Sequence, residues 1–374
     1  MVNQYRCFPI RLFFNMLAGM NLYRTVFLWL LLLLVAGACK DVYYPGELDS
    51  SVKIPVIQGI ILQGQAPVVT LSWAMRYNDQ QTTYISDANV SVTDDLGNSV
   101  KLYGYGTYTS YGMVGAVGRS YSLQVDLSDG SSYTSSFVAM PKPPVIDSIY
   151  AQPVRKTVYT YGADNLLVPE DQQGLNILAD LSGEGDTTLY YRFNTNVVKE
   201  MIINIGHGLG MYSQYLWQVS TLDNSYSVDY TVSHDNRQVL MQHTIGFLRY
   251  FYDASIETPN QSAPYTQGWV LTCNVYAIPA DVYDYYNAIT SQLNGNDQIF
   301  APVPVQVNGN IHCTSKPGSS VLGVFEAASV STIYKAFFWR DLNSYRSKVL
   351  NSFPSGIGNG SENFFPPSFW VISN

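Results

Sequence analysis

Charge is scarce in this sequence, and positive charge is scarcer than negative charge. Only 13% of the 374 residues are charged, and 20 basic residues stand against 28 acidic ones, for a formal net charge of −8. Proteins that bind nucleic acid need a basic surface to neutralise phosphate groups. The composition therefore argues against nucleic acid as a partner.

Long helix-forming runs are nearly absent, whereas the chain carries 30 Tyr residues. Aromatic and β-branched residues are enriched in strands. Short runs of alternating apolar and polar residues, bounded by turn residues, also predict strands. We therefore expect a mainly all-β protein. The strand candidates are Val56–Leu62, Val68–Trp73, Ala88–Thr93, Tyr121–Leu127, Tyr133–Val138, Leu189–Val198, Tyr226–Val232 and Trp269–Ile278.

One segment has the period of a helix, from Pro279 to Leu293. Proline suits the first turn of a helix, because its missing N–H has no partner there in any case. Apolar residues then recur at helical spacing, with polar residues on the opposite face. We expect this helix to pack on a sheet.

Cysteine is rare, with four residues in the whole chain. Cys7 lies in a segment that we expect to be discarded, and Cys39 lies at the end of an apolar run. Cys273 and Cys313 are left, and in an oxidising envelope two such cysteines predict a disulfide. Its closed loop would stabilise the fold by roughly 4 kcal/mol on the loop-entropy model. The alternative is two buried free thiols.

Catalytic and metal-binding motifs are missing as well. The chain has neither the HExxH pattern of zinc proteases nor the GxSxG elbow of serine hydrolases. The four histidines are scattered along the sequence: His207, His234, His243 and His312. The Asp-rich turns at Asp94–Asp95 and Asp129–Gly130 lack the dense oxygen ligands of a calcium loop, and Asp-Gly is first of all a hairpin turn.

Two further patterns only superficially suggest chemistry. The glycine-rich segment 206–210 lacks the Lys and Ser/Thr that complete a phosphate loop. Asp180, Glu184 and Asp186 lie between two strand candidates, in a segment whose residue types are typical of a turn. We therefore expect no catalytic residues, no metal site, no cofactor and no enzymatic activity.

The only long apolar run, Val26–Cys39, predicts export and anchoring. Arg24 precedes about ten apolar residues, and the small residues Ala36–Ala38 follow them, as in a secretory signal. The run is shorter than the roughly twenty residues that span a bilayer. A cysteine directly after the small residues is typical of a lipoprotein box, so we expect cleavage before Cys39 and lipidation of its thiol, which anchors the chain without a membrane span. An uncleaved membrane anchor is the alternative.

The signal peptide then occupies residues 1–38, and we expect Met20 to be the true start, since a start there gives a compact signal with one arginine. Residues 39–53 form the lipidated cysteine and a polar tether. Within it, Lys40–Asp41 matches the short signal that sends many Bacteroidetes lipoproteins to the outer face of the outer membrane. We therefore expect the mature protein to be exposed at the cell surface. Attachment to the periplasmic face of the outer membrane is the alternative.

The mature chain divides at a proline-rich segment, residues 141–144, which cannot pair in a central strand and favours an extended connector. Before it, residues 54–140 show the short strands and regular turns of a β-sandwich. After it, residues 145–374 form a larger β-rich domain, which ends in a tail rich in aromatic residues.

Pieces spread over most of the mature protein resemble Bacteroidetes lipoproteins grouped as a domain of unknown function, family 4249. The order and coverage of these pieces carry the resemblance. They are Val69–Ser72, Ala88–Val92, Asp94–Gly97, Gly118, Tyr121, Leu123, Asp129–Gly130, Tyr133, Pro143–Ser148, Tyr190–Arg192, Tyr285–Tyr286, Asn310–Ile311, Val321–Phe325 and Ala327.

The resemblance implies an immunoglobulin-like first domain, similar to carboxypeptidase regulatory-like modules, followed by a β-rich partner domain. It implies no established activity. Genes of such proteins often lie beside those of TonB-dependent outer-membrane receptors. We therefore expect a non-enzymatic outer-membrane lipoprotein that binds such a receptor, a glycan or peptide ligand, or both. A surface adhesin or structural protein of the cell envelope is the alternative.

Overall fold

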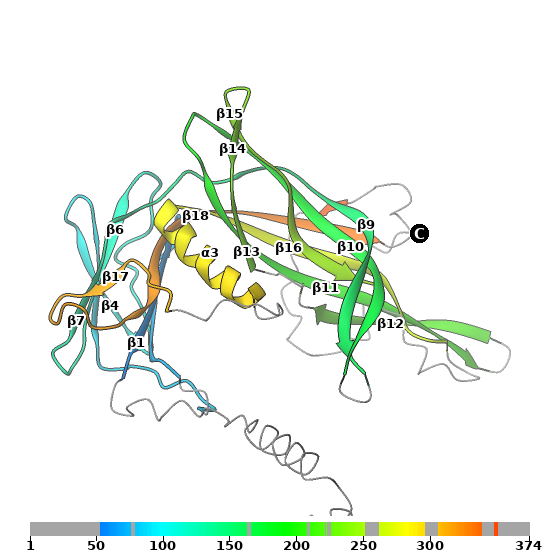
Figure 1. Cartoon of the computed structure of the whole chain (residues 1–374), viewed down its shortest axis with the longest axis horizontal. Coiled ribbons are helices and arrows are strands. Elements are labelled where there is room, and N and C mark those ends of the chain that lie inside the picture. Colours follow the sequence, from blue (N-terminus) through cyan, green and yellow to red (C-terminus); the bar gives the residue numbers. More distant parts are fainter. Residues whose placement is uncertain are drawn as a thin grey trace, which may run out of the picture. The chain divides into compact units, whose positions relative to one another are not determined.

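A computed structural model describes residues 53–75, 79–162, 166–207, 210–220, 222, 226–250, 262–295, 306–338 and 348–350. These residues belong to one unit, Lys53–Asn374. Strands dominate it and one helix is described, so the all-β prediction is confirmed (Figure 1). The signal peptide, Cys39, Lys40–Asp41 and the aromatic tail lie outside the described residues.

The first part of the unit is built from short strands with alternating burial. In β1, for example, Ile57 and Ile61 are buried while Gln58 is exposed, so one face of the strand points into a core. The strands are β1 (Pro55–Leu62), β2 (Val68–Trp73), β3 (Asn89–Asp94), β4 (Ser99–Tyr105), β5 (Thr107–Thr109), β6 (Ser120–Asp126), β7 (Ser132–Ser135) and β8 (Val138–Ala139).

Two C-terminal strands complete this first part. β17 (Ile311–Cys313) pairs with β7, and the first half of β18 (Leu322–Phe338) pairs in parallel with β1. Phe325 of β18 is fully buried among residues of β1, β3 and β6. The strands of residues 54–140 therefore share one core with a segment almost two hundred residues later in the chain.

The second part consists of longer strands in two facing sheets. One is a four-stranded sheet in the order β14-β15-β10-β9, and the other runs β12-β11-β16-β18, with β13 on β11 and β19 on β18. The strands are β9 (Val145–Tyr161), β10 (Leu167–Glu184), β11 (Tyr190–His207), β12 (Gly210–Ser220), β13 (Tyr226–Tyr230), β14 (Val232–His234), β15 (Arg237–Arg249), β16 (Tyr265–Ile278) and β19 (Lys348–Leu350).

A second core fills the space between these two sheets. Its residues alternate along the strands: Ile149, Leu175, Ile177, Phe193, Val197, Ile245, Trp269, Leu271, Cys273 and Val275 are all buried in it. The predicted core face of Trp269–Ile278, which includes Cys273, is confirmed, and residues 268–273 are buried on both faces of the strand. The long hairpin of β9 and β10 was not predicted from the sequence.

β18 joins the two parts, because its two halves pair with different strands. Residues 322–328 lie beside β1, and residues 329–338 lie antiparallel to β16. The proline-rich segment 141–144 has no regular secondary structure and runs along the same strand. Ser329 Oγ donates a hydrogen bond to the carbonyl of Pro141, and Ser331 Oγ donates one to that of Pro144 at 2.8 Å. Hydrogen bonds to β18 thus hold the segment between the two parts.

The helix, α3 (Ala280–Gly295), follows β16 directly, as predicted for residues 279–293. It lies beside β13, β11 and β18 (Figure 1). Val282 is fully buried in the core of the first part, and Tyr285 and Tyr286 pack against that core. The helix therefore packs on sheet surface, and its apolar face contacts strands that are far apart in the sequence.

Candidate functional site

A groove lies between α3 and the outward face of the sheet formed by β2, β1 and β18. Because side chains alternate along β1, Ile57 and Ile61 enter the core while Gln58 and Ile60 face outward under the helix. The groove has a volume of about 460 Å³, within the range of small-molecule sites. Its lining residues are Gln58, Gly59, Ile60, Val68, Thr70, Tyr285, Tyr286, Ile289, Val324 and Glu326.

A buried carboxylate lies at the base of this groove. The side chain of Glu326 is only 1% exposed, and its Oε1 lies 2.7 Å from Nη2 of Arg192. The hydroxyl of Tyr286 donates a hydrogen bond to the other oxygen, Oε2, at 2.8 Å. Both carboxylate oxygens therefore have strong partners, as a buried charge requires.

Aromatic rings hold the Arg192 guanidinium in place. Its central carbon lies 3.9 Å from the ring centroid of Tyr276 and 5.2 Å from that of Tyr286. A guanidinium over an aromatic face is attracted by the electrons of the ring. Burial raises the pKa of Tyr276, although the nearby Arg192 opposes this shift. This cluster connects β11, β16, β18 and α3 at the base of the groove.

The groove is arranged for binding. Its walls are mostly apolar or aromatic, while Gln58 and Thr70 add neutral polar groups that are not part of the Arg192–Glu326 cluster. A small ligand with apolar surface and a few hydrogen-bonding groups fits such a lining. Sequence reasoning did not identify Glu326, although a glutamate in the apolar run Val321–Ala328 was a signal for a buried charge.

The predicted disulfide between Cys273 and Cys313 is wrong, because both cysteines are free and buried. Cys273 belongs to the core between the two long sheets, whereas Cys313 belongs to the core of the first part. The two thiols therefore lie in different cores and are not bonded to each other. The alternative of two buried thiols is the observed state.

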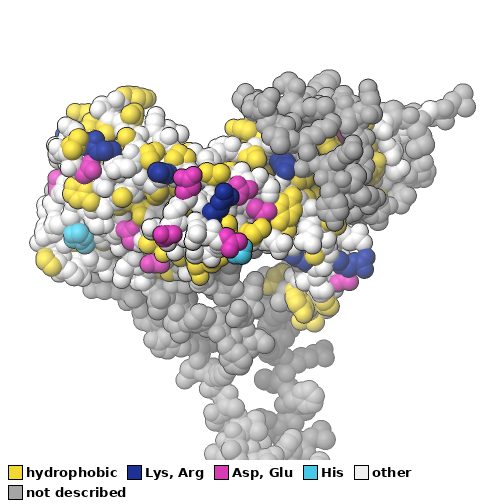
Figure 2. All heavy atoms as spheres, turned by 90° about the horizontal axis from the view of Figure 1, so that it is seen from above, with side chains coloured by type: hydrophobic (Ala, Val, Ile, Leu, Met, Phe, Trp, Pro, Cys, Tyr) yellow, Lys and Arg dark blue, Asp and Glu magenta, His cyan; other side chains and the backbone are white. Residues whose placement is uncertain are grey.

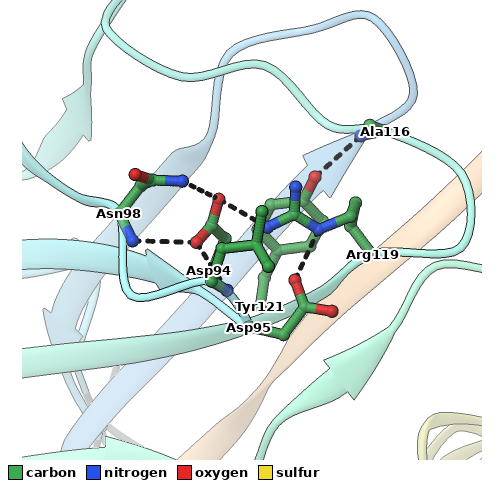
Figure 3. A network of polar contacts seen from close by, with 7 residues as sticks. Asp94, Asp95, Asn98, Ala116, Arg119 and Tyr121 are labelled. Atoms are coloured by element: carbon green, nitrogen blue, oxygen red, sulfur yellow. Dashed lines mark hydrogen bonds and ion pairs between the residues drawn. The ribbon is translucent and has the colours of Figure 1, made fainter.

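The Asp94–Asp95 turn forms a closed polar network (Figure 3). Asp94 Oδ1 accepts hydrogen bonds from the backbone N–H groups of Leu96 and Asn98, at 3.0 and 2.9 Å. Arg119 lies 2.7 Å from Asp94 and 2.5 Å from Asp95. The hydrogen bond from the Asn98 side chain outweighs burial and, with the other donors, lowers the pKa of Asp94. These carboxylates stabilise a turn.

The other carboxylate and histidine candidates are dispersed. Asp180 accepts a hydrogen bond from the backbone N–H of Gln242 at 2.7 Å, beside an irregularity between β10 and β15. His207 ends β11, His312 lies on β17, and His234 lies 3.4 Å from Asp235 at the surface. Within the described ranges, no group of three His, Cys, Asp or Glu residues is placed to hold a metal ion.

The surface carries exposed tyrosines on the first part of the fold. Tyr103 and Tyr105 of β4 are 68% and 82% exposed, and Tyr84 beside the same hairpin is 54% exposed. Figure 2 shows that Lys and Arg side chains are scattered among Asp and Glu on one face of the described residues. A mixed distribution of this kind differs from the continuous basic surface that nucleic-acid binding requires.

Among the residues that the structure describes, no helix has the length and apolar composition needed to cross a membrane. A family model described as a domain of unknown function, DUF4249, matches residues 43–333, which include every residue that lines the groove. The comparison with curated proteins finds no match.

Proposed function

We propose that this chain, which belongs to the DUF4249 family, is a lipid-anchored, surface-exposed protein of the outer membrane. It binds a ligand, a TonB-dependent receptor, or both, as an accessory component of a transport system. The apolar run that ends at Cys39 supports the anchor, because two or more acyl chains on one cysteine hold a protein firmly on a membrane. The matched region begins at residue 43, directly behind that cysteine.

The groove under α3 carries the proposal. It combines apolar walls with a polar base that is already ordered, so a ligand pays little to order the site. Arg192 and Tyr286 each hold one oxygen of Glu326, so this carboxylate is fixed as part of the base of the groove. We therefore assign binding without catalysis to the groove, with a glycan or a peptide as the ligand.

Co-purification tests the receptor part of the proposal. The tagged full-length chain is extracted from its native membranes in mild detergent, and associated β-barrel receptors are identified by mass spectrometry. Ile60→Trp fills the groove, and Val114→Trp is the matched control, since Val114 is 54% exposed and does not line the groove. We expect a receptor with the wild type and the control, and at least a tenfold lower recovery with Ile60→Trp. Absence of any receptor from the wild-type sample would contradict the proposal.

The anchor has its own test. Replacing Cys39 with Ala removes the thiol that receives the lipid, so metabolic labelling with a fatty acid should disappear and the protein should leave the membrane fraction. Protease added to intact cells should digest the wild-type chain if it faces outward. Persistent labelling of the Cys39→Ala variant would contradict lipidation, and full protection from protease would place the chain on the periplasmic side.

A surface adhesin is the second candidate, and the exposed tyrosines of the first part favour it. Tyrosine rings stack on sugars and anchor protein interfaces. The double variant Tyr103→Ser/Tyr105→Ser should lose binding to immobilised glycans or matrix proteins without a receptor present. Such a loss, together with unchanged receptor recovery, would favour adhesion over transport.

A further inference from the structure

We propose that Ser227, His243 and Asp229 form a nucleophile–base–carboxylate triad that hydrolyses esters with an apolar acyl group. His243 Nε2 lies 3.1 Å from Ser227 Oγ, and His243 Nδ1 lies 2.6 Å from Asp229 Oδ2. This is the connectivity by which a histidine takes a proton from a serine while a carboxylate orients its ring. The triad is separate from the groove, so either proposal can fail without the other.

Two sheets bring the three residues together. Ser227 and Asp229 are two positions apart on β13, so their side chains emerge on the same face of the strand. His243 comes from β15 in the opposite sheet. The sequence order Ser, Asp, His over 17 residues matches no contiguous catalytic motif, which explains why motif searching does not find it.

The hydrogen bonds give each residue a role. The Asp229 carboxylate faces Nδ1, which favours the tautomer with the proton on Nδ1 and leaves Nε2 free to accept the serine proton. The other carboxylate oxygen, Oδ1, accepts the backbone N–H of Tyr230 at 2.8 Å. Burial acts to raise the pKa of Asp229, but the hydrogen bonds from His243 and Tyr230 outweigh it and the pKa is lowered. Asp229 is therefore a positioning residue that stays ionised.

The imidazole is held by packing as well as by hydrogen bonds. The ring of Phe193 stacks on that of His243, with 4.5 Å between centroids and 28° between the planes. The His243 side chain is 11% exposed and that of Asp229 is 33% exposed, so the pair lies at the boundary between core and solvent. Ser227 is half-buried. Such a position combines a fixed base with access from solvent.

Apolar surface adjoins the triad and indicates the substrate class. A cavity of about 470 Å³ reaches the triad at Asp229, while Ser227 and His243 lie beside it and not in its lining. The other lining residues are Tyr230, Val232, Ser233, His234, Val239, Leu240 and Met241. Tyr230, Val232 and Met241 are large hydrophobic residues that are nevertheless exposed, at 46%, 58% and 65%. An apolar acyl chain would cover them, whereas a charged substrate would gain little from this lining.

The reaction balances without any cofactor. Ser227 Oγ bonds to the carbonyl carbon of the ester, and its proton moves to His243 Nε2. The tetrahedral adduct then breaks its bond to the alcohol, which leaves with that proton. Water attacks the acyl-serine in the same way, which releases the carboxylic acid and restores the serine hydroxyl. The sum is ester plus water to acid plus alcohol.

The test uses the folded full-length chain and two probes. A fluorophosphonate phosphonylates an activated serine with loss of fluoride, and the adduct is located by peptide mass spectrometry. Hydrolysis of p-nitrophenyl butanoate reports turnover. We expect an adduct on Ser227 that is absent from Ser227→Ala, and hydrolysis that falls at least about 100-fold in Ser227→Ala and Asp229→Asn. Ser213→Ala is the matched control, since Ser213 lies on β12 and hydrogen-bonds Asn204.

A second measurement needs no variant. Labelling of the wild type before and after unfolding in urea compares the same serine with and without the triad, and we expect the Ser227 adduct only in the folded chain. No adduct on Ser227 in the folded wild type would overturn the proposal. A folded Ser227→Ala variant that hydrolyses the ester at the wild-type rate would overturn it as well.

Discussion

At the scale of single residues, Arg192 and Glu326 show how a buried charge constrains its surroundings. Their side chains are 7% and 1% exposed, so each depends on the other for compensation. Replacing Arg192 with Met leaves the Glu326 carboxylate without a cation. We expect the free energy of unfolding to fall by roughly 3–5 kcal/mol. Urea denaturation measures this loss.

Two further variants test whether the loss of stability comes from the unpaired charge. The double variant Arg192→Met/Glu326→Leu removes both charges and should recover most of the stability, since apolar residues can replace a buried ion pair. Glu170→Gln is the exposed control, because Arg249 and Glu170 are 48% and 46% exposed and such a pair contributes about 0–1 kcal/mol. A loss no larger than that of the control would show that Arg192 does not compensate a buried charge.

The two free thiols should differ in reactivity. Burial raises the pKa of Cys273 to about 12, although a hydrogen bond from Thr195 opposes the shift. Burial also acts to raise the pKa of Cys313, but hydrogen bonds from Ser315 and from backbone N–H groups outweigh it, and the pKa is lowered. The thiolate is the reactive form. At pH 8, N-ethylmaleimide should therefore modify Cys313 at least about 100-fold faster than Cys273, as peptide mass spectrometry can measure. Equal rates, or linked cysteines, would contradict this expectation.

At the scale of elements, the parallel pairing of β1 with β18 depends on Gly323. Its φ of +105° is rarely adopted by other residues, and a Cβ there would lie 2.0 Å from the carbonyl oxygen of Ile57. Gly323→Ala should therefore force the two strands apart. Gly97 is the matched control, with a φ of +83° in open space. We expect Gly97→Ala to cost about 1–2 kcal/mol from the backbone alone and Gly323→Ala at least twice as much by denaturation. If the two variants lost the same free energy of unfolding, the close approach of β1 and β18 at Gly323 would not contribute to stability.

At the scale of the whole molecule, the core of the first part depends on residues from the far end of the chain. β17 and the first half of β18 supply Ile311, Val324 and Phe325 to it. A fragment of residues 53–144 lacks these side chains and leaves the edge of β1 unpaired. We expect this fragment to show no cooperative thermal unfolding by circular dichroism, whereas the full chain does. A sharp transition of the fragment would contradict the shared core.

Local pattern made much of the fold predictable. Alternation along residues 56–62 predicts a strand with one buried face, and the helical period of residues 279–293 predicts a helix; both elements are present in the structure. Along residues 269–278 the predicted core face is also present, but residues 268–273 are buried on both faces of the strand. The β9–β10 hairpin was missed, because its outer ends carry exposed Tyr159, Tyr161 and Leu166, which obscure the alternation. The prediction of a disulfide failed for another reason, since the sequence does not show which core each of the two cysteines enters.

The sequence by itself determined the strand-rich composition and the helix after residue 279, because each depends on the spacing of neighbouring residues. Only the tertiary structure decided that β18 joins two cores, that Arg192 meets Glu326 across 134 positions, and that His243 of one sheet faces Ser227 and Asp229 of the other. These contacts depend on how strands from distant segments of the chain pair and pack. Local periodicity identifies the buried face of a strand, but it does not determine which strand lies opposite.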